Sequence, residues 1–184
     1  MAAAPQDVTG FWRTAGPRKW YAKDARFDAA IALKFEPVHH AAARGEYDGW
    51  AATTEGALAL VILFDQFPRN LFRGSPHAFA TDGRARRVAR TALNAGHDRA
   101  VDPQLRQFFY MPFEHSEDLA DQDEAVRLFT AVRDETGDAE PLKWAVIHHE
   151  IIARFGRFPH RNASLGRITT PAEQAFLDDD GFAG

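Results

Sequence analysis

Hydrophobic residues recur at helical spacing along most of the chain. Between residues 24 and 44 they stand three or four positions apart, at Phe27, Ile31, Phe35 and Val38. This spacing places them on one face of an α-helix. Pro37 lies within the segment and predicts a kink or a break there, because proline removes a backbone donor and crowds the preceding turn. The pattern therefore predicts an amphipathic helix over residues 24–44.

The most apolar segment is ALALVILFDQF at residues 57–67. Thr53 or Thr54 can cap a helix here, Glu55 suits its first turn, and Pro68 is expected to end it. The segment is apolar on nearly all sides, which is typical of a helix in the centre of a core. A buried strand is the competing interpretation, but alanine and leucine outnumber the β-branched residues that favour strands.

Proline, glycine and capping residues divide the rest of the chain into further helices. Ser75-Pro76 begins a helix that should end at residues 94–96, and Asp102-Pro103 begins one whose last turn Pro112 should disturb. A helix over about 117–135 should stop at Gly137, and a short one follows Thr170-Pro171. Pro141 opens another, with one apolar face made of Trp144, Ile147, Ile151 and Phe155.

These segments predict an all-α fold of about seven or eight helices joined by short loops, with helix starts compatible with stacked antiparallel pairs. No turn of the kind that joins two alternating strands is found, and no sequence repeat of fixed period. No linker or low-complexity stretch divides the chain. We therefore expect residues 1–184 to form a single domain.

Composition excludes several classes of function. The 184 residues include no cysteine, which rules out disulfides, thiol nucleophiles and cysteine-bound metals. A net charge of −4 argues against nucleic acid as a partner, since nucleic-acid binding needs a basic surface. No apolar run approaches the roughly 20 residues that cross a membrane, and the N-terminal residues do not resemble a signal peptide. The expected location is the cytoplasm.

The first concentration of polar residues is FDQFPRNLFRG, residues 64–74, at the end of the most apolar helix. Asp65, Arg69, Asn70 and Arg73 are expected to lie next to the core rather than on a free surface. The alternative is that the arginines only close the C-terminal end of a helix, where positive charge is favoured.

The second concentration is YMPFEHSEDLADQDE, residues 110–124. Ser116 can cap the following helix, with Glu117 and Asp118 in its first turn. This capping role does not explain Glu114 and His115, which come before the cap and are the better candidates for a site. Imidazole and carboxylate groups could bind a metal, but the spacing matches no established metal motif.

The third concentration is HHEIIARFGRFPHRNASLGR, residues 148–167. Between Ile151 and Ala172 there are four arginines and no carboxylate, so these arginines must find partners elsewhere in the fold or in a ligand. The acids of residues 114–118 are the expected partners. Gly156 and Pro159 explain why the helix ends here.

Other sites of known geometry are not indicated. The phosphate-binding glycine loop, the dinucleotide fingerprint, the nucleophile elbow and the zinc motif with two histidines four residues apart are all missing. His148 and His149 are adjacent and cannot share one helix face, so this pair alone is not expected to bind a metal, and no metal ligand is named. His39 and His40 are interpreted as surface histidines or as histidines with satisfied hydrogen bonds. The sequence leaves the cofactor unknown.

Taken together, FDQFPRNLFRGSPHAFATD, FFYMPFEHSEDLADQ and RFGRFPHRNASLGRITTPAEQAFL resemble the bacterial family called domain of unknown function nine hundred and twenty-four. The resemblance extends from Phe11 to Leu177 and implies stacked helical hairpins of the tetratricopeptide-repeat type. It brings no established activity. Phe64 departs from the expected leucine, which should affect packing only. The motif residues map onto Asp65, Gln66, Arg69, Asn70, Arg73, Glu114, His115, Glu117, Asp118, Arg157, His160, Arg161, Asn162 and Arg167.

Three hypotheses about function follow. In the first, the three segments line one polar cleft that binds a small anionic metabolite or a peptide carboxylate. In the second, the protein is a hydrolase-type enzyme with Glu114 or His115 as general base, with or without a metal. In the third, the charged residues only pair with one another. The candidate ligand-binding residues are Asp65, Arg69, Asn70, Arg73, Glu117, Arg157, His160, Arg161 and Asn162.

Overall fold

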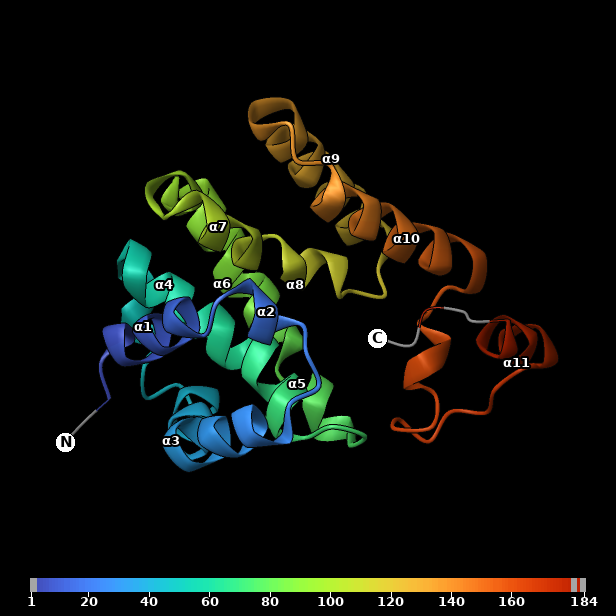
Figure 1. Ribbon diagram of the computed structural model, residues 1–184, viewed down its shortest axis with the longest axis horizontal. Helices are drawn as coiled ribbons and strands as arrows, with labels where there is room; N and C mark the ends of the chain where they lie inside the picture. Colours follow the sequence, from blue (N-terminus) through green and yellow to red (C-terminus); the bar gives the residue numbers. More distant parts are fainter. Residues whose placement is uncertain (1–2, 180–181, 183–184) are drawn as a thin grey trace. The chain divides into compact units, whose positions relative to one another are not determined.

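A computed structural model of the protein describes residues 3–179 and residue 182. It forms two compact units. Unit 1 comprises Met1–Arg73 and His77–Pro112, and unit 2 comprises Gly74–Pro76 and Phe113–Gly184. The described residues form helices and no strand, which confirms the predicted fold class (Figure 1). The strand interpretation of residues 57–67 is therefore wrong.

The first half of the chain carries short helices besides the long ones. In order, the elements are α1 (Pro5–Ala15), α2 (Pro17–Trp20), α3 (Ala25–Ala43), η1 (Asp48–Ala52), α4 (Thr54–Val61), η2 (Ile62–Gln66), α5 (Phe67–Leu71), η3 (Pro76–Phe79), α6 (Asp82–Asn94), η4 (His97–Ala100), α7 (Pro103–Arg106), η5 (Gln107–Phe109) and α8 (Met111–Glu114). The sequence pattern does not predict α1 and α2. Ser75-Pro76 begins the short η3 rather than the long helix, which starts only at Asp82.

The core of unit 1 is built around α4 and η2. Residues 56–67 are all buried, as their composition predicts. Helices α1 and α6 pack on α4, and α3 packs on η2 and α5. Several aromatic side chains pack together in this core. The ring centres of Trp12 and Phe67 are 5.6 Å apart, and those of Trp12 and Phe108 are also 5.6 Å apart. Unit 1 thus holds the polar segment 64–74 against a dense apolar centre.

The helix of residues 54–71 continues through Pro68, where the sequence predicts an end. It does so by widening into a π-turn at η2, in which Phe67 donates its backbone N–H to the carbonyl of Ile62. Because Pro68 has no N–H, the carbonyls of the turn before it lose a backbone donor. Two side chains supply hydrogen bonds instead: His39 Nδ1 lies 2.8 Å from the Leu63 oxygen, and Thr81 Oγ1 lies 2.7 Å from the Phe64 oxygen.

His39 therefore has a structural role, in line with its interpretation as a satisfied histidine. Burial lowers the pKa of His39, although its hydrogen bond to Leu63 acts in the opposite direction. The ring is accordingly neutral near pH 7, and its Nδ1 carries the hydrogen donated to the Leu63 carbonyl. Helix α3, which carries His39, runs from Ala25 to Ala43 without a break at Pro37.

Unit 2 is built on a helical hairpin. Helix α9 (Leu119–Thr136) and helix α10 (Glu140–Phe155) lie side by side, joined by a short loop that Gly137 opens with φ 79° (Figure 1). The 3₁₀ turn η6 (Pro159–Arg161) and helix α11 (Pro171–Asp178) follow. Ile151, Ile152 and Phe158 form the centre of the unit 2 core.

The buried face of α10 includes most of the predicted stripe. Ile151 is buried and Ile147 and Phe155 pack against the same core, whereas Trp144 is 41% exposed. Ala145, His148 and Ile152 are also buried, so the face carries a histidine into the interior. None of the helices in the described part of the chain is long and apolar enough to cross a membrane.

Candidate functional site

The polar segment 64–74 forms an ion-pair network inside unit 1. Arg69 donates two hydrogen bonds to Asp82, of 3.0 and 3.1 Å, and one of 2.5 Å to the backbone carbonyl of Asp65. The same guanidinium lies 3.2 Å from the Asp65 carboxylate, which is completely buried. The π-turn places Asp65 and Arg69 in contact, one turn apart. The network therefore supports the fold directly behind the most apolar helix.

The end of the segment is held by Asp28 of helix α3. Asn70 donates a 2.8 Å hydrogen bond to Asp28, and Arg73 donates two, of 2.7 and 3.1 Å. Burial acts to raise the pKa of Asp28, but the hydrogen bonds from Arg73 and Asn70 outweigh burial, and the pKa is lowered. Both Arg69 and Arg73 thus have carboxylate partners within unit 1.

Hydrogen bonds from side chains of unit 2 hold the turn at residues 114–118. Gln122 Nε2 donates hydrogen bonds of 2.6 Å to the carbonyls of both Glu114 and Ser116. Ser116 accepts from the Asp118 backbone N–H and donates to Asp121. The N-cap of α9 is Asp118, not Ser116 as predicted, because the helix begins only at Leu119. Gln122 is completely buried and positions both Glu114 and His115 through the backbone.

Glu117 ties this turn to the segment 154–167. It accepts two hydrogen bonds from Arg167, of 2.7 and 3.0 Å, and one of 2.9 Å from the Phe158 backbone N–H. Burial alone would raise the pKa of Glu117, but these donors lower it. The expected pairing between the acids of 114–118 and the arginines of the third segment is confirmed for Arg167 and Glu117.

A buried carboxyl–imidazole pair lies beside that contact. His148 Nδ1 is 3.0 Å from Glu114 Oε1, and the two side chains are only 8% and 6% exposed. The same nitrogen is 2.8 Å from the Trp144 carbonyl, one turn earlier on α10. Because Nδ1 faces two acceptors, it carries the hydrogen in either charge state of the ring. Nε2 is consequently the nitrogen that gains or loses a proton.

Two further histidines and two phenylalanines surround His148. The ring centres of His115 and His148 are 6.2 Å apart. Phe158 and Phe182 pack on His148 with ring centres at 5.5 and 4.5 Å, and Phe182 also contacts His160 at 5.3 Å. Phenylalanine rings exclude water from the pair, which strengthens its electrostatic interaction.

His160 is held in its neutral form. Burial lowers the pKa of His160 to about 3, and the positive charge of Arg161 acts in the same direction. Its Nδ1 is buried and makes no hydrogen bond with any described residue. Arg161 itself is 6% exposed, and its guanidinium carbon lies 4.4 Å from the centre of the Phe158 ring. A charged group and a neutral imidazole therefore stand close to the His148 pair.

Arg157 pairs with Glu173, not with residues 114–118. It donates hydrogen bonds of 2.5 and 2.8 Å to the two carboxylate oxygens of Glu173. Glu173 also accepts from the Thr170 backbone N–H in a capping box at the start of α11, and Asn162 lies 3.4 Å away. The Arg157 hydrogen bonds, followed by that from Thr170, lower the pKa of Glu173 to about 2.

The lowered pKa of Glu173 predicts that unit 2 loses stability in acid. Since its folded-state pKa is about 2 and its usual value is 4.5, the stabilisation is present above pH 4.5 and is lost as the pH falls towards 2. Glu173→Gln should therefore lower the melting temperature at pH 7, and this difference should shrink as the pH falls towards 2. Thermal unfolding followed by circular dichroism at a series of pH values measures it.

Glu150→Gln is the matched control, because Glu150 is exposed on α10. Its melting temperature should follow the wild type at every pH. A Glu173→Gln variant that also follows the wild type would show that the Arg157–Glu173 pair contributes nothing to folding.

Comparison with known proteins identifies the family of this chain. The sequence profile described as "Bacterial protein of unknown function (DUF924)" matches residues 8–181. The chain belongs to this family. The resemblance drawn from the three polar segments is thereby confirmed. The tetratricopeptide-type stacking remains a prediction.

A solved structure is similar to that of the DUF924 chain. The structure titled as a protein of unknown function, ATU0120, from Agrobacterium tumefaciens superposes with a TM-score of 0.89 and 48% sequence identity. The match covers 95% of this chain and 97% of the other. No curated protein matches the chain. At this identity the two proteins share their fold over almost their whole length.

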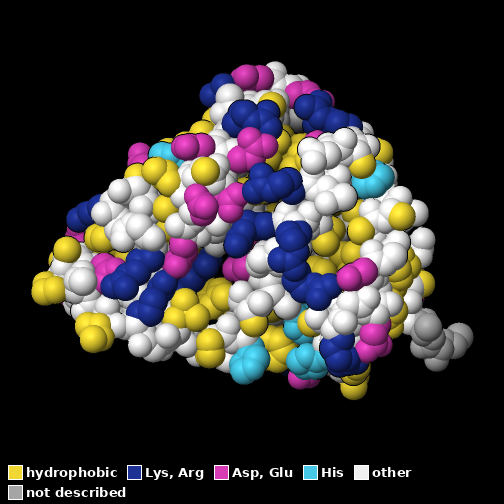
Figure 2. All heavy atoms as spheres, turned by 180° about the vertical axis from the view of Figure 1, so that it is seen from behind, with side chains coloured by type: hydrophobic (Ala, Val, Ile, Leu, Met, Phe, Trp, Pro, Cys, Tyr) yellow, Lys and Arg dark blue, Asp and Glu magenta, His cyan; other side chains and the backbone are white. Residues whose placement is uncertain are grey.

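The structure divides the predicted DUF924 site residues between the two units. Asp65, Arg69, Asn70 and Arg73 lie in unit 1, and the remaining candidates, Glu114, His115, Glu117, Arg157, His160, Arg161 and Asn162, lie in unit 2. On the face drawn in Figure 2, Lys and Arg side chains lie beside Asp and Glu side chains. No group of three or more histidines and acids with the geometry of a metal site occurs among the described residues.

Several residues of these networks are not among the site residues that the sequence predicts. Asp28 and Asp82 complete the ion pairs of unit 1, and His148, Gln122 and Glu173 complete those of unit 2. One signal was present for His148, which stands four residues after Trp144 and three before Ile151, within the apolar stripe of its helix. A histidine at such a position is carried into the interior and needs a polar partner there.

Proposed function

We propose that this DUF924 protein is a cytoplasmic hydrolase-type enzyme whose acid–base centre is the Glu114–His148 pair of unit 2. The observation that carries the proposal is the 3.0 Å contact between Glu114 Oε1 and His148 Nδ1, with both side chains almost fully buried. A buried carboxyl that holds one nitrogen of a histidine is the arrangement by which enzymes orient a general base.

In the enzyme hypothesis drawn from the sequence, Glu114 or His115 is the base, and the geometry supports a different division of roles. Glu114 and the Trp144 carbonyl hold the Nδ1 hydrogen of His148. Nε2 then takes a proton from a water molecule that attacks the substrate, and Glu114 stabilises the resulting imidazolium. The proton passes from Nε2 to the leaving group, so that the pair returns to its starting state.

The surroundings of the pair favour such chemistry. Phe158 and Phe182 pack on His148 and lower the local dielectric, which strengthens the pull of Glu114 on the imidazolium. His115 is a second group that can exchange a proton, since its ring centre is 6.2 Å from that of His148. Gln122 positions Glu114 and His115 through their shared turn.

Binding of an anionic metabolite or peptide carboxylate is the second candidate function, and Arg161 is its candidate group in unit 2. Arg161 stacks on Phe158, whose ring also contacts His148. An acidic group of the substrate bound at Arg161 would therefore lie beside the proposed base.

Substitution of the pair tests the enzyme proposal. The wild-type protein should hydrolyse at least one class in a panel of nitrophenyl esters, nitrophenyl phosphates and peptide amides. His148→Asn should lower that rate by about 100-fold or more, the usual contribution of a general base. Glu114→Gln should lower it too, since an amide cannot stabilise the imidazolium.

His149→Asn is the matched control. His149 is the next residue of the same helix, but it pairs with the exposed Asp123 at 2.9 Å. Its rate and its melting temperature should stay at the wild-type values. The proposal is wrong if no substrate class is turned over, or if the three variants have equal rates.

A further inference from the structure

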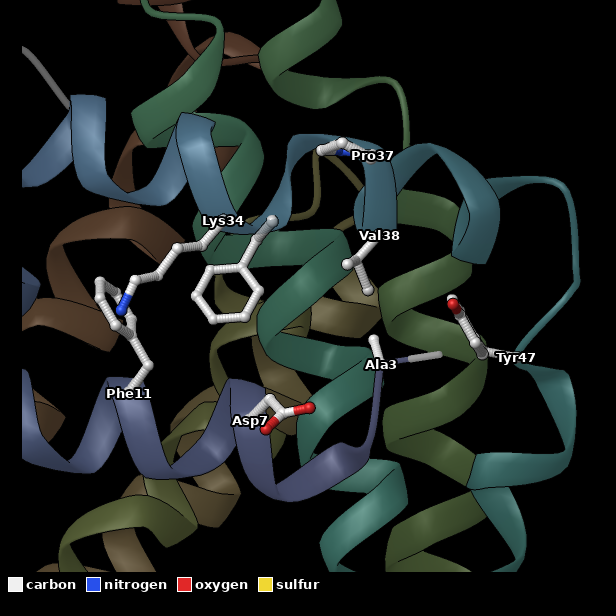
Figure 3. Close-up of a pocket in the computed structure, with 8 residues that line it drawn as sticks. Ala3, Asp7, Phe11, Lys34, Pro37, Val38 and Tyr47 are labelled. Carbon is white, nitrogen blue, oxygen red and sulfur yellow. The ribbon is translucent and has the colours of Figure 1, made fainter. Parts of the chain in front are cut away.

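A groove between α1 and α3 of unit 1 has the size of a small-molecule site. Its volume is about 540 Å³, within the range of roughly 300–1,000 Å³ that ligand pockets occupy. Phe11 of α1 and Phe35 and Val38 of α3 form apolar walls, and Lys34, Asp7 and Tyr47 supply polar groups (Figure 3). None of these residues belongs to the networks described above.

The cation in this groove, Lys34, differs from Arg69 and Arg73. Arg69 and Arg73 are held by carboxylates, whereas Lys34 has no acidic side chain within ion-pair distance among the described residues. Its ammonium group lies 5.2 Å from the centre of the Phe11 ring, directly above the apolar wall. Figure 3 shows Lys34 and Phe11 together at one end of the groove, and Tyr47 at the other.

Asp7 limits the charge that the groove accepts. Its carboxylate accepts a 2.8 Å hydrogen bond from the Ala4 backbone N–H at the start of α1, so it is fixed in place. The groove therefore offers one positive end at Lys34, an apolar middle at Phe35 and Val38, and a negative group on α1. A second negative charge on a ligand would be repelled by Asp7.

We propose that this groove binds a small amphipathic monocarboxylate. The carboxylate lies at Lys34, and the hydrocarbon part covers Phe35 and Val38 towards Tyr47. Apolar contact provides most of the affinity, and the charge of Lys34 fixes the direction in which the molecule lies. The site is independent of the acid–base centre in unit 2.

Titration of the ¹⁵N-labelled full chain with octanoate and with octanol tests the proposal. Both should shift the NMR signals of α1 and α3, and octanoate should bind about two- to fivefold more tightly, as expected for a partly exposed charge pair. Lys34→Met should abolish this preference while octanol binding is kept. Val38→Trp should weaken both by filling the groove.

Lys23→Met is the matched control, because Lys23 is an exposed lysine of unit 1 that does not line the groove. Its preference for octanoate should equal that of the wild type. Equal affinity of the wild type for octanoate and octanol would overturn the proposal, as would signal shifts confined to other helices. A wild-type dimer that Val38→Trp dissociates would assign the groove to a second copy of the chain and also overturn it.

Discussion

Arg69→Met should lower the free energy of unfolding by about 3–5 kcal/mol, the usual cost of removing one partner from a buried ion pair. Methionine keeps most of the apolar contact of the arginine but removes its charge. The Asp65 carboxylate is completely buried and that of Asp82 is nearly so, and each loses its contact with the guanidinium in this variant. Urea unfolding followed by circular dichroism measures the loss.

Arg73→Met is the control for this result. Arg73 pairs with Asp28 near the surface, its side chain is 38% exposed, and such pairs contribute up to about 1 kcal/mol. A small effect of Arg69→Met, similar to that of Arg73→Met, would contradict the structural role of the network. Segment 64–74 would then again be a candidate ligand site.

Gly56→Ala should destabilise unit 1 by about 2–4 kcal/mol, although alanine normally favours a helix over glycine. A Cβ at this position would lie 2.1 Å from the Trp50 carbonyl oxygen and 2.8 Å from the Trp50 carbonyl carbon, far inside normal contact. Both are backbone atoms, so a side-chain rotation cannot relieve the overlap. The melting temperature should fall by roughly 5–15 °C.

Gly10→Ala is the matched helical control. Gly10 lies in α1, and a Cβ there would meet no atom within 4 Å. Alanine should then raise stability by up to about 1 kcal/mol, because it costs less conformational entropy in a helix. Equal effects of the two substitutions would mean that the approach of Trp50 to α4 is not as close as described.

The contacts within each unit indicate different roles for the two units. In unit 1 the charged residues of segment 64–74 hold carboxylates of the same unit behind a π-turn, which favours the interpretation that they support the fold. In unit 2 the pair of Glu114 and His148 is surrounded by aromatic rings and other histidines. The proposed function therefore rests on unit 2 alone.

Local signals predicted much of the helical structure. Thr53 caps α4, Asp102 caps α7, and Thr170 caps α11, because each cap depends only on neighbouring residues. Gly137 and Gly156 end α9 and α10 with positive φ, as their positions indicate. Signals within one or two turns of a helix are thus readable without knowing the fold.

Other elements depend on contacts that sequence spacing does not show. The helix passes Pro68 because His39 and Thr81, both distant in sequence, supply the hydrogen bonds that the turn requires. Helix α10 buries His148, whose Nδ1 lies 3.0 Å from Glu114, whereas Trp144 is 41% exposed. In both cases the partners are distant in the sequence.

The amino-acid sequence by itself determined the helical class of this protein, its family, its buried central helix and the three segments in which polar chemistry is concentrated. The tertiary structure alone decided which charges meet: Arg157 with Glu173, Arg69 with Asp82, and His148 with Glu114. The reason is physical. Helix formation depends on residues a few positions apart, whereas the partner of a buried charge is chosen by the packing of elements that are distant in the chain.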